Sequence, residues 1–246
     1  MGMQQTHGSA DIIDSARAAL GSEPRLDLHA TPVRLSLEQG VLTAEGELED
    51  VATKKLALER LAALPGVTGI IDRLRVAPAE SMGDDEIRIL VGNALVQDPA
   101  LGNIALYEID KGERLTIHEP SVGGRGAIVV SVDDGIVTLD GDVPGLAQKR
   151  LAGVLAWWVP GSRDVVNGIG VTPPEEDSDG EITEAVRIAL EKDPFVNAGQ
   201  IRVRTEKAEV ILDGYVTSET ERHMAECDAW YVFGVDRVEN RIDVPG

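Results

Sequence analysis

The chain has 246 residues, of which 23 are Lys or Arg and 43 are Asp or Glu, so its formal net charge at neutral pH is −20. A surface of this charge repels phosphate backbones, which excludes nucleic acid as an expected partner. It also disfavours direct binding to an anionic bilayer, whereas metal cations and basic proteins remain open. Hydrophobic residues make up 43% of the sequence and aromatic residues only 3%, so aliphatic side chains must fill the core.

The first ten residues do not resemble a signal peptide. Residues 1–10 lack the basic and apolar stretches of a signal peptide, and we expect them to form a flexible N-terminus. No apolar run reaches the roughly 18 residues of a transmembrane helix. We therefore expect a cytoplasmic protein as the sequence stands, or a periplasmic one if a signal peptide has been removed.

Three segments repeat one pattern of helix, strand, strand, helix and strand, read from apolar spacing. In the first segment the expected elements lie at residues 12–20, 33–37, 42–44, 57–64 and 70–76. In the second they lie at 87–95, 128–132, 137–139, 152–159 and 165–171. In the third they lie at 182–190, 201–205, 210–212, 225–232 and 238–244.

Each copy also carries glycine at two fixed places and a polar residue in its last strand. One glycine ends the second strand and another follows 20 residues later, giving Gly46, Gly66, Gly141, Gly161, Gly214 and Gly234. Six residues after the second glycine stand Asn167 and Asn240 in the later copies, and Asp72 in the first. We assign these glycines and asparagines a structural role that defines the repeat.

Local signals mark some turns and helix starts. The hairpins of the first two copies contain Gly40 and Gly135, which tolerate the positive φ of a tight turn, whereas the third has Lys207-Ala208 and its turn type stays open. We expect the acidic run 84–86 to favour a helix start through the helix dipole. Ser218 and Glu221 resemble a capping box.

The repeated pattern resembles the BON domain, named for bacterial OsmY and nodulation proteins. The resemblance is carried by Asp98-Pro99, Asp193-Pro194, Val137–Gly141, Val210–Gly214 and Gly234–Val244. It implies an α+β fold of three tandem αββαβ modules, each a small three-stranded sheet with two helices on one face. It also implies a binding or envelope-associated module, often proposed to contact phospholipid, and it supplies no catalytic residues.

The pattern divides the chain into modules at 11–78, 84–172 and 181–246, with an acidic linker at 173–180. The second module contains an insertion at about 100–127, in which 104–109 and 114–118 look like two short strands. We favour an accessory hairpin that covers a sheet edge or a neighbouring module, and a functional loop is the alternative.

Aromatic side chains distinguish the later copies from the first. The second helix carries Trp157 and Trp158 in the second copy, Trp230 and Tyr231 in the third, and Ala62-Ala63 in the first. Neither pair fits wholly onto the core stripe, so we expect an interface. We favour contact between the second and third copies over an external partner. Together with Tyr107 and Arg125 of the insertion, these four aromatic residues form the candidate interaction surface.

No constellation indicates catalysis, a cofactor or a metal site. The four histidines are scattered and lack metal-ligand spacing, and the single Cys227 suggests a structural thiol without a matched histidine. We therefore expect no catalytic, cofactor-binding or metal-binding residues, and no cofactor.

The sequence thus indicates a non-enzymatic bacterial binding or scaffolding protein. We expect it to act in stress or envelope physiology through a protein partner or a phospholipid surface. One alternative is a K⁺ or Ca²⁺ sensor that binds cations weakly, and another is a structural module that forms homo-oligomers. Residues 1–78 carry a net charge of −3, whereas 79–175 and 176–246 carry −8 and −9, which directs the search for a cationic partner to the later copies.

Overall fold

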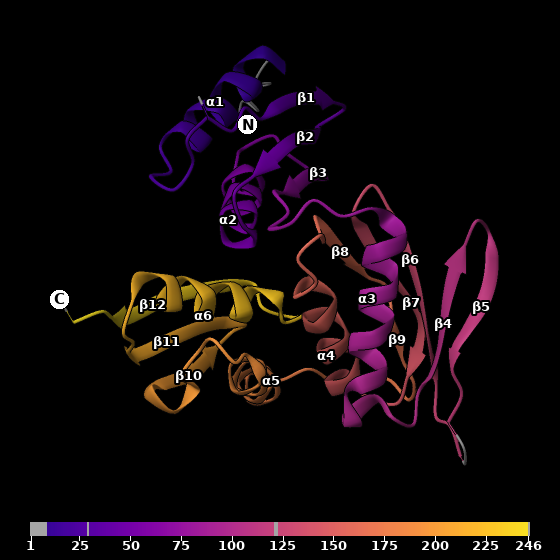
Figure 1. Ribbon diagram of the computed structural model, residues 1–246. Helices are drawn as coiled ribbons and strands as arrows, with labels where there is room; N and C mark the ends of the chain where they lie inside the picture. The colour runs from indigo at the N-terminus through magenta and orange to yellow at the C-terminus, as the bar shows by residue number, and fades with distance from the viewer. Residues whose placement is uncertain (1–8, 29, 121–122, 246) are drawn as a thin grey trace. The chain divides into compact units, whose positions relative to one another are not determined.

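The computed structural model describes residues 9–28, 30–120 and 123–245 (Figure 1). The chain falls into two compact units divided after Ala77. Helix α1 already begins at Ser9, and the expectation of a flexible N-terminus otherwise concerns residues 1–8, which lie outside the described part. In the described ranges, none of the helices combines the length and apolar character needed to cross a membrane.

The first unit holds one copy of the repeat. Its elements are α1 (Ser9–Gly21), β1 (Arg34–Glu38), β2 (Val41–Leu48), α2 (Val51–Ala62) and β3 (Gly69–Val76). Strand β2 is central, antiparallel to β1 and parallel to β3. The helices bury Leu20 and Leu61 against Leu42 and Leu74 of the sheet, all at most 1% exposed. This aliphatic core matches the apolar stripes of the sequence.

The second copy contains the insertion. Its elements are α3 (Asp84–Gln97), η1 (Pro99–Leu101), β4 (Ala105–Asp110), β5 (Glu113–His118), β6 (Ala127–Asp133), β7 (Ile136–Val143), α4 (Leu146–Trp157), β8 (Asp164–Asn167) and β9 (Gly170–Val171). The two strands expected in the insertion are confirmed as β4 and β5. Because β4 pairs in parallel with β6, the sheet order becomes β5-β4-β6-β7-β8, with β9 also on β7. The hairpin thus covers the edge of β6 and adds two strands, and because the last strand is divided into β8 and β9 the sheet has six strands in all.

The third copy returns to the simple pattern. Its elements are α5 (Asp179–Lys192), η2 (Ala198–Gln200), β10 (Ile201–Glu206), β11 (Glu209–Tyr215), α6 (Glu219–Tyr231) and β12 (Arg237–Asp243). The sheet order is β10-β11-β12, with the last pair parallel. The expected α+β fold of three αββαβ modules is therefore confirmed.

The glycine expected to end the second strand lies within that strand in each copy, one or two residues before its last residue, where the preceding segment comes too close for a side chain. At Gly141 and Gly214 the φ angles are +115° and +142°. A Cβ atom there would lie 2.1 Å from the carbonyl oxygen of Ala127 or Gln200, respectively. Any side chain at these positions would push the two strands apart.

The asparagine of the last strand ties that strand to the second helix. Nδ2 of Asn167 donates to the carbonyl of Lys149 at 2.8 Å, and Nδ2 of Asn240 donates to that of Arg222 at 3.0 Å. In the first copy Asp72 has no amide to donate, and it instead pairs with the buried Lys54 at 3.0 Å. The departure from asparagine in the first copy is thus matched by an ionic tie between the same two elements.

The acidic start of α3 does more than favour a helix N-terminus. The carboxylate of Asp84 accepts hydrogen bonds from the backbone N–H groups of Asp134 and Gly135, at 3.0 and 2.8 Å. It therefore fastens the β6–β7 turn to the helix, a contact that dipole reasoning from the sequence missed.

The third copy uses the same device on a turn without glycine. Lys207 and Ala208 both adopt left-handed backbone conformations, with φ of 54° and 60°. Their N–H groups donate to the carboxylate of Asp179 at 2.8 and 2.9 Å, and these two bonds lower the pKa of Asp179. The carboxylate helps to hold a conformation that alanine disfavours.

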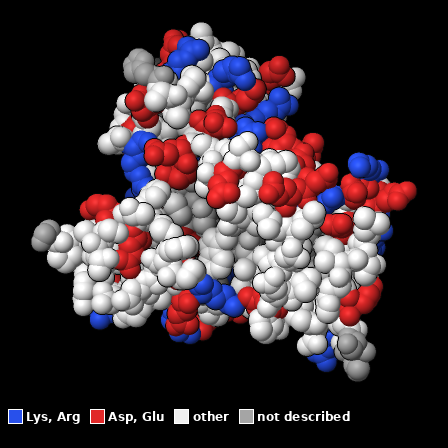
Figure 2. Space-filling view, in the orientation of Figure 1, with Lys and Arg blue, Asp and Glu red and all other residues white. Residues whose placement is uncertain are grey.

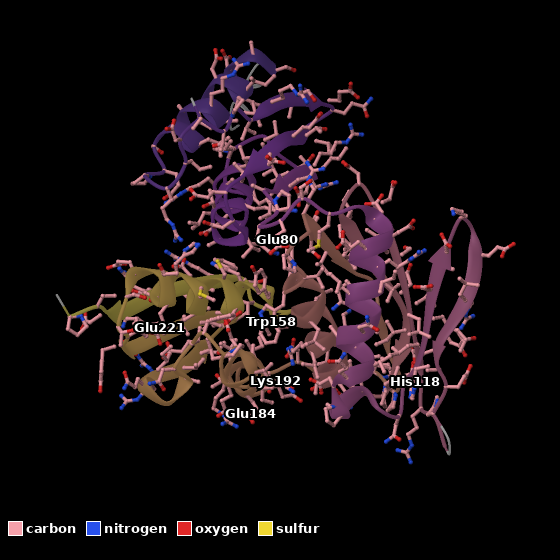
Figure 3. All side chains as sticks on the ribbon, viewed as in Figure 1. Glu80, His118, Trp158, Glu184, Lys192 and Glu221 are labelled. Atoms are coloured by element: carbon pink, nitrogen blue, oxygen red, sulfur yellow. The ribbon has the colours of Figure 1, made fainter. Side chains whose placement is uncertain are left out.

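The expected capping box is only half formed. Ser218 caps α6 by accepting from the N–H of Glu221 at 3.1 Å. The carboxylate of Glu221 accepts instead from the N–H of Thr217 and from that of Asn197, which lowers its pKa. Glu221, labelled in Figure 3, thereby joins two loops of the third copy.

Candidate functional site

The second and third copies meet through their helices. Helix α4 contacts α3 of its own copy and both α5 and α6 of the third (Figure 1). All four helices belong to the same compact unit. The junction therefore consists of helix faces, while each sheet lies behind its own helices.

Aromatic side chains occupy this junction. The rings of Trp157 and Tyr231 stack with centroids 5.2 Å apart and an interplanar angle of 16°. Nε1 of Trp158, at the end of α4, donates to Oδ1 of Asp228 on α6 at 2.8 Å. Trp230 is only 4% exposed. Three of the four helix aromatics thus make direct contacts between the copies.

The remaining two residues of the candidate interaction surface lie on the insertion. The hydroxyl of Tyr107 on β4 donates to Glu119 at 2.6 Å, which raises the pKa of the phenol, and the guanidinium of Arg114 covers its ring at 3.6 Å. Arg125 is exposed, with its backbone N–H bonded to the carbonyl of Asn103. The structure does not bring either residue into the aromatic junction.

A buried carboxyl group lies beside the aromatic rings. Asp228 is 2% exposed, and burial raises its pKa to about 8. The neighbouring carboxyl of Asp193 raises the pKa further, while the Trp158 N–H opposes the shift. At neutral pH the side chain of Asp228 is therefore mostly protonated and bridges the junction as a neutral group.

Two ion pairs complete the junction. Nη2 of Arg150, on α4, donates to Asp177 of the linker at 2.5 Å, and its Nε donates to the carbonyl of Phe233 at 2.9 Å. On the other side, Nζ of Lys192 at the end of α5 donates to Asp98, which follows α3, at 2.7 Å. Each of these two cations therefore forms an ion pair that helps to connect the second and third copies.

Between α4 and α5 lies a groove of about 470 Å³. Its apolar lining comes from both helices and the residue after α6: Leu146, Leu151, Val154, Ala185, Ile188, Ala189 and Val232. A volume of this size lies within the usual range of small-molecule sites. Because the two copies supply opposite walls, the groove depends on their packing.

Half of the six polar residues that line the groove are acidic. Three exposed glutamates contribute: Glu175, Glu181 and Glu184. Glu175 accepts from the backbone N–H of Leu146 at 2.7 Å. Figure 3 labels Glu184 and Lys192 on α5. On the face drawn in Figure 2, acidic side chains are dispersed rather than gathered into one patch, so acidity alone does not mark a site. The groove is set apart by its shape and its apolar lining.

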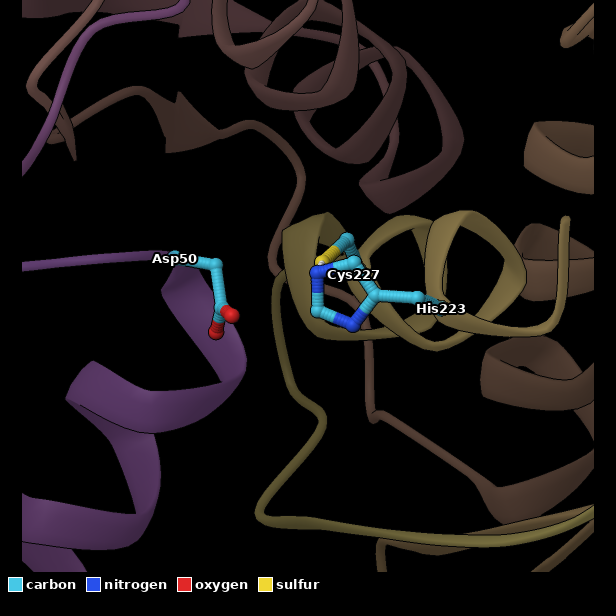
Figure 4. A group of neighbouring side chains, drawn as sticks. All are labelled: Asp50, His223 and Cys227. Atoms are coloured by element: carbon cyan, nitrogen blue, oxygen red, sulfur yellow. Dashed lines mark hydrogen bonds between the residues drawn. The ribbon is translucent and has the colours of Figure 1, made fainter. Parts of the chain in front are cut away.

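A cysteine and a histidine stand one turn apart on α6 (Figure 4). Sγ of Cys227 lies 3.6 Å from Nε2 of His223. The expectation that Cys227 has no matched histidine is therefore wrong, and the spacing of four residues on a helix was the missed signal. The thiol itself is buried, as expected for a structural cysteine.

Comparison with known proteins identifies the repeated unit. The family model of the BON domain matches residues 9–78, 119–173 and 178–246. The second match begins after the hairpin β4–β5, which agrees with the place of the insertion. BON domains are bacterial binding modules related to the envelope.

Two other comparisons concern curated proteins and solved structures. No curated protein matches the chain. Among solved structures it is similar to the C-terminal domain of CdsD, a structural protein of the type III secretion system of Chlamydia trachomatis, at 14% identity over 98% of this chain and 100% of that one, with a TM-score of 0.25. A second CdsD structure matches at 15% identity over 96% and 92% of the two chains, with the same TM-score.

The three BON matches cover most of the sequence, and each overlaps one of the three αββαβ copies in the structure. The chain therefore belongs to the BON domain family and carries three tandem copies.

Proposed function

We propose that this protein is a non-catalytic binding module whose ligand site is the groove between α4 and α5. The observation that carries the proposal is the apolar groove of about 470 Å³, which two BON copies build together. Its two lining cations, Arg150 and Lys192, are already paired with carboxylates of the junction. The groove therefore offers shape and apolar contact rather than a free acid–base or nucleophilic pair.

The proposed setting is the bacterial envelope or the stress response. Family membership supports an envelope-related binding role, through a protein partner or a phospholipid surface. The net charge of −20 favours partners that are neutral or basic. A metabolite screen in which the purified protein turned over a compound, with loss on one polar substitution, would contradict the non-catalytic part of the proposal.

The groove is tested by filling it. Ala185 lines the groove on α5, and Ala185→Trp should occupy it, whereas Ala18→Trp places the same ring on an exposed face of α1 as a matched control. Nile red, a neutral apolar dye, should bind the wild type and the control but bind Ala185→Trp at least tenfold more weakly. Circular dichroism and thermal unfolding check that both variants remain folded. Equal dye binding by all three proteins would refute the groove as the site.

The outer strand of the hairpin favours a second candidate function, self-association. Strand β5 lies at the end of the sheet order, and Leu115 on it is 41% exposed. An uncovered strand edge is suited to pairing with another strand. Light scattering should then show a dimer that Leu115→Lys dissociates. A wild type that stays monomeric across concentrations would remove this candidate.

A further inference from the structure

We infer that the α4–α5 groove accepts an elongated amphipathic cation, in which an aliphatic chain carries a protonated amine at one end. The inference rests on the proposed function, because it takes the groove as the ligand site and adds the chemical class of the ligand. Three features of the groove support it: apolar walls, cations that already have ionic partners, and glutamates whose charge is not compensated.

The walls of the groove suit an aliphatic chain. Leu151 and Val154 on α4 are 9% and 2% exposed, and Ala189 on the facing α5 is 2% exposed. No aromatic residue stands among the residues that line the groove, so the walls offer no ring for stacking on a flat ligand. Each methylene that leaves water against such walls should lower Kd by roughly fourfold.

The cations at the groove are neutralised by acids from outside its lining. Arg150 pairs with Asp177 at 2.5 Å, and Lys192 pairs with Asp98 at 2.7 Å. Arg150 is only 2% exposed, and its Nε donates a second hydrogen bond to the carbonyl of Phe233. An anionic head group would meet cations whose charge a carboxylate already balances, so it would gain less there than at an unpaired cation.

The glutamates at the groove carry negative charge that their bonding partners do not fully neutralise. Glu184 pairs with Arg187, but that same arginine also pairs with Glu191. Glu175 takes a backbone N–H as its hydrogen-bond donor, and Glu181 takes the hydroxyl of Ser178. None of these uncharged donors cancels a carboxylate charge. The exposed side of the groove is therefore net negative, which favours an ammonium group over a neutral or anionic head.

Three eight-carbon ligands separate the contributions of tail and head. Octylamine, octanol and octanoate carry a cationic, a neutral and an anionic head group at pH 7, and isothermal titration calorimetry gives the Kd of each. The alkyl chain of octanoate is one carbon shorter, which by itself weakens its binding by roughly fourfold. We expect octylamine to bind about tenfold more tightly than octanol, and octanoate to bind most weakly. The preference for the amine should shrink in 0.5 M NaCl, because salt screens exposed charges.

Two kinds of variant test whether the preference for octylamine comes from the glutamates of the groove: one changes a charge and the other fills the groove. Glu181→Gln should reduce the preference for octylamine over octanol severalfold, whereas Glu206→Gln makes the same charge change on the β10 strand and should leave it unchanged. Equal binding of the three ligands, all abolished by Ala185→Trp, would overturn the cation preference and leave the groove as the site. Tightest binding of octanoate would also overturn it. Ligand binding that Ala185→Trp does not weaken would instead refute the proposed function.

Discussion

The buried Asp228 makes the stability of the second unit depend on pH in an unusual direction. In the unfolded chain its carboxyl has an ordinary pKa of 3.8, whereas in the folded junction burial raises that pKa to about 8. The folded state therefore holds a proton that the unfolded state releases. The free energy of unfolding should be highest at low pH on this account, and should fall as pH rises from about 4 to about 8.

The size of the effect follows from the pKa difference. Each pH unit between the two pKa values costs about 1.4 kcal/mol, so the wild type should lose roughly 4 kcal/mol of stability between pH 5 and pH 8. Glu221 acts in the opposite sense, because its lowered pKa stabilises the fold above its ordinary pKa of 4.5 and is lost as pH falls. Stability should therefore be greatest near pH 5.

Asp228→Asn isolates the contribution of Asp228. The asparagine keeps an oxygen that can accept from Trp158, but it cannot ionise. We expect the variant to be more stable than the wild type by about 2–4 kcal/mol at pH 8 and to differ from it by less than about 1 kcal/mol at pH 5. Asp236→Asn removes an exposed carboxyl of the same copy and serves as the control.

Urea unfolding followed by tryptophan fluorescence provides the measurement. All three tryptophans lie in the second unit, so the signal reports that unit alone. The midpoint and slope are compared at pH 5, 6.5 and 8 for the wild type and both variants. A wild type whose stability is constant over this range, or an Asp228→Asn protein that loses stability with pH as steeply as the wild type, would show that Asp228 is ionised in the fold.

Three further substitutions test the packing arguments by thermal or urea unfolding. Ala208→Gly should stabilise the third copy by roughly 1 kcal/mol, because glycine adopts the left-handed conformation without strain, and a loss of stability would contradict this. Gly214→Ala should destabilise by roughly 3 kcal/mol or more, since its Cβ would meet the Gln200 carbonyl at 2.1 Å; a neutral result would refute the close approach. Trp157→Ala should cost roughly 2 kcal/mol by removing the stack on Tyr231, and an unchanged midpoint would refute that contact.

The repeat and its elements could be predicted from the sequence because they follow from local spacing. Apolar positions three and four apart mark one helix face, and alternation marks a half-buried strand, whatever the rest of the chain does. The repeated glycines were visible in the sequence through their constant spacing, although the strands continue one or two residues past them, and their cause is close backbone approach at Gly141 and Gly214. The two strands of the insertion were also local patterns, at 104–109 and 114–118.

Contacts between distant elements could not be predicted from local sequence patterns. The carboxylates of Asp84 and Asp179 bind hairpin turns about 50 and 28 residues further along the chain, and in the sequence they are indistinguishable from ordinary acidic helix starts. The raised pKa of Asp228 depends on burial by the neighbouring copy, which composition does not reveal. The groove likewise has no sequence signal, because its walls are ordinary core aliphatics until two copies place them opposite each other.

One position links the sequence to the way the copies combine. At the end of the second helix the later copies carry Trp157-Trp158 and Trp230-Tyr231, and these copies form one compact unit with its rings in the junction. The first copy has Ala62-Ala63 there and forms a unit by itself. The rings of Trp157 and Tyr231 supply buried area that joins the second and third copies. Because the groove lies between α4 and α5 of these two copies, its shape depends on the packing that the aromatic residues at this position provide.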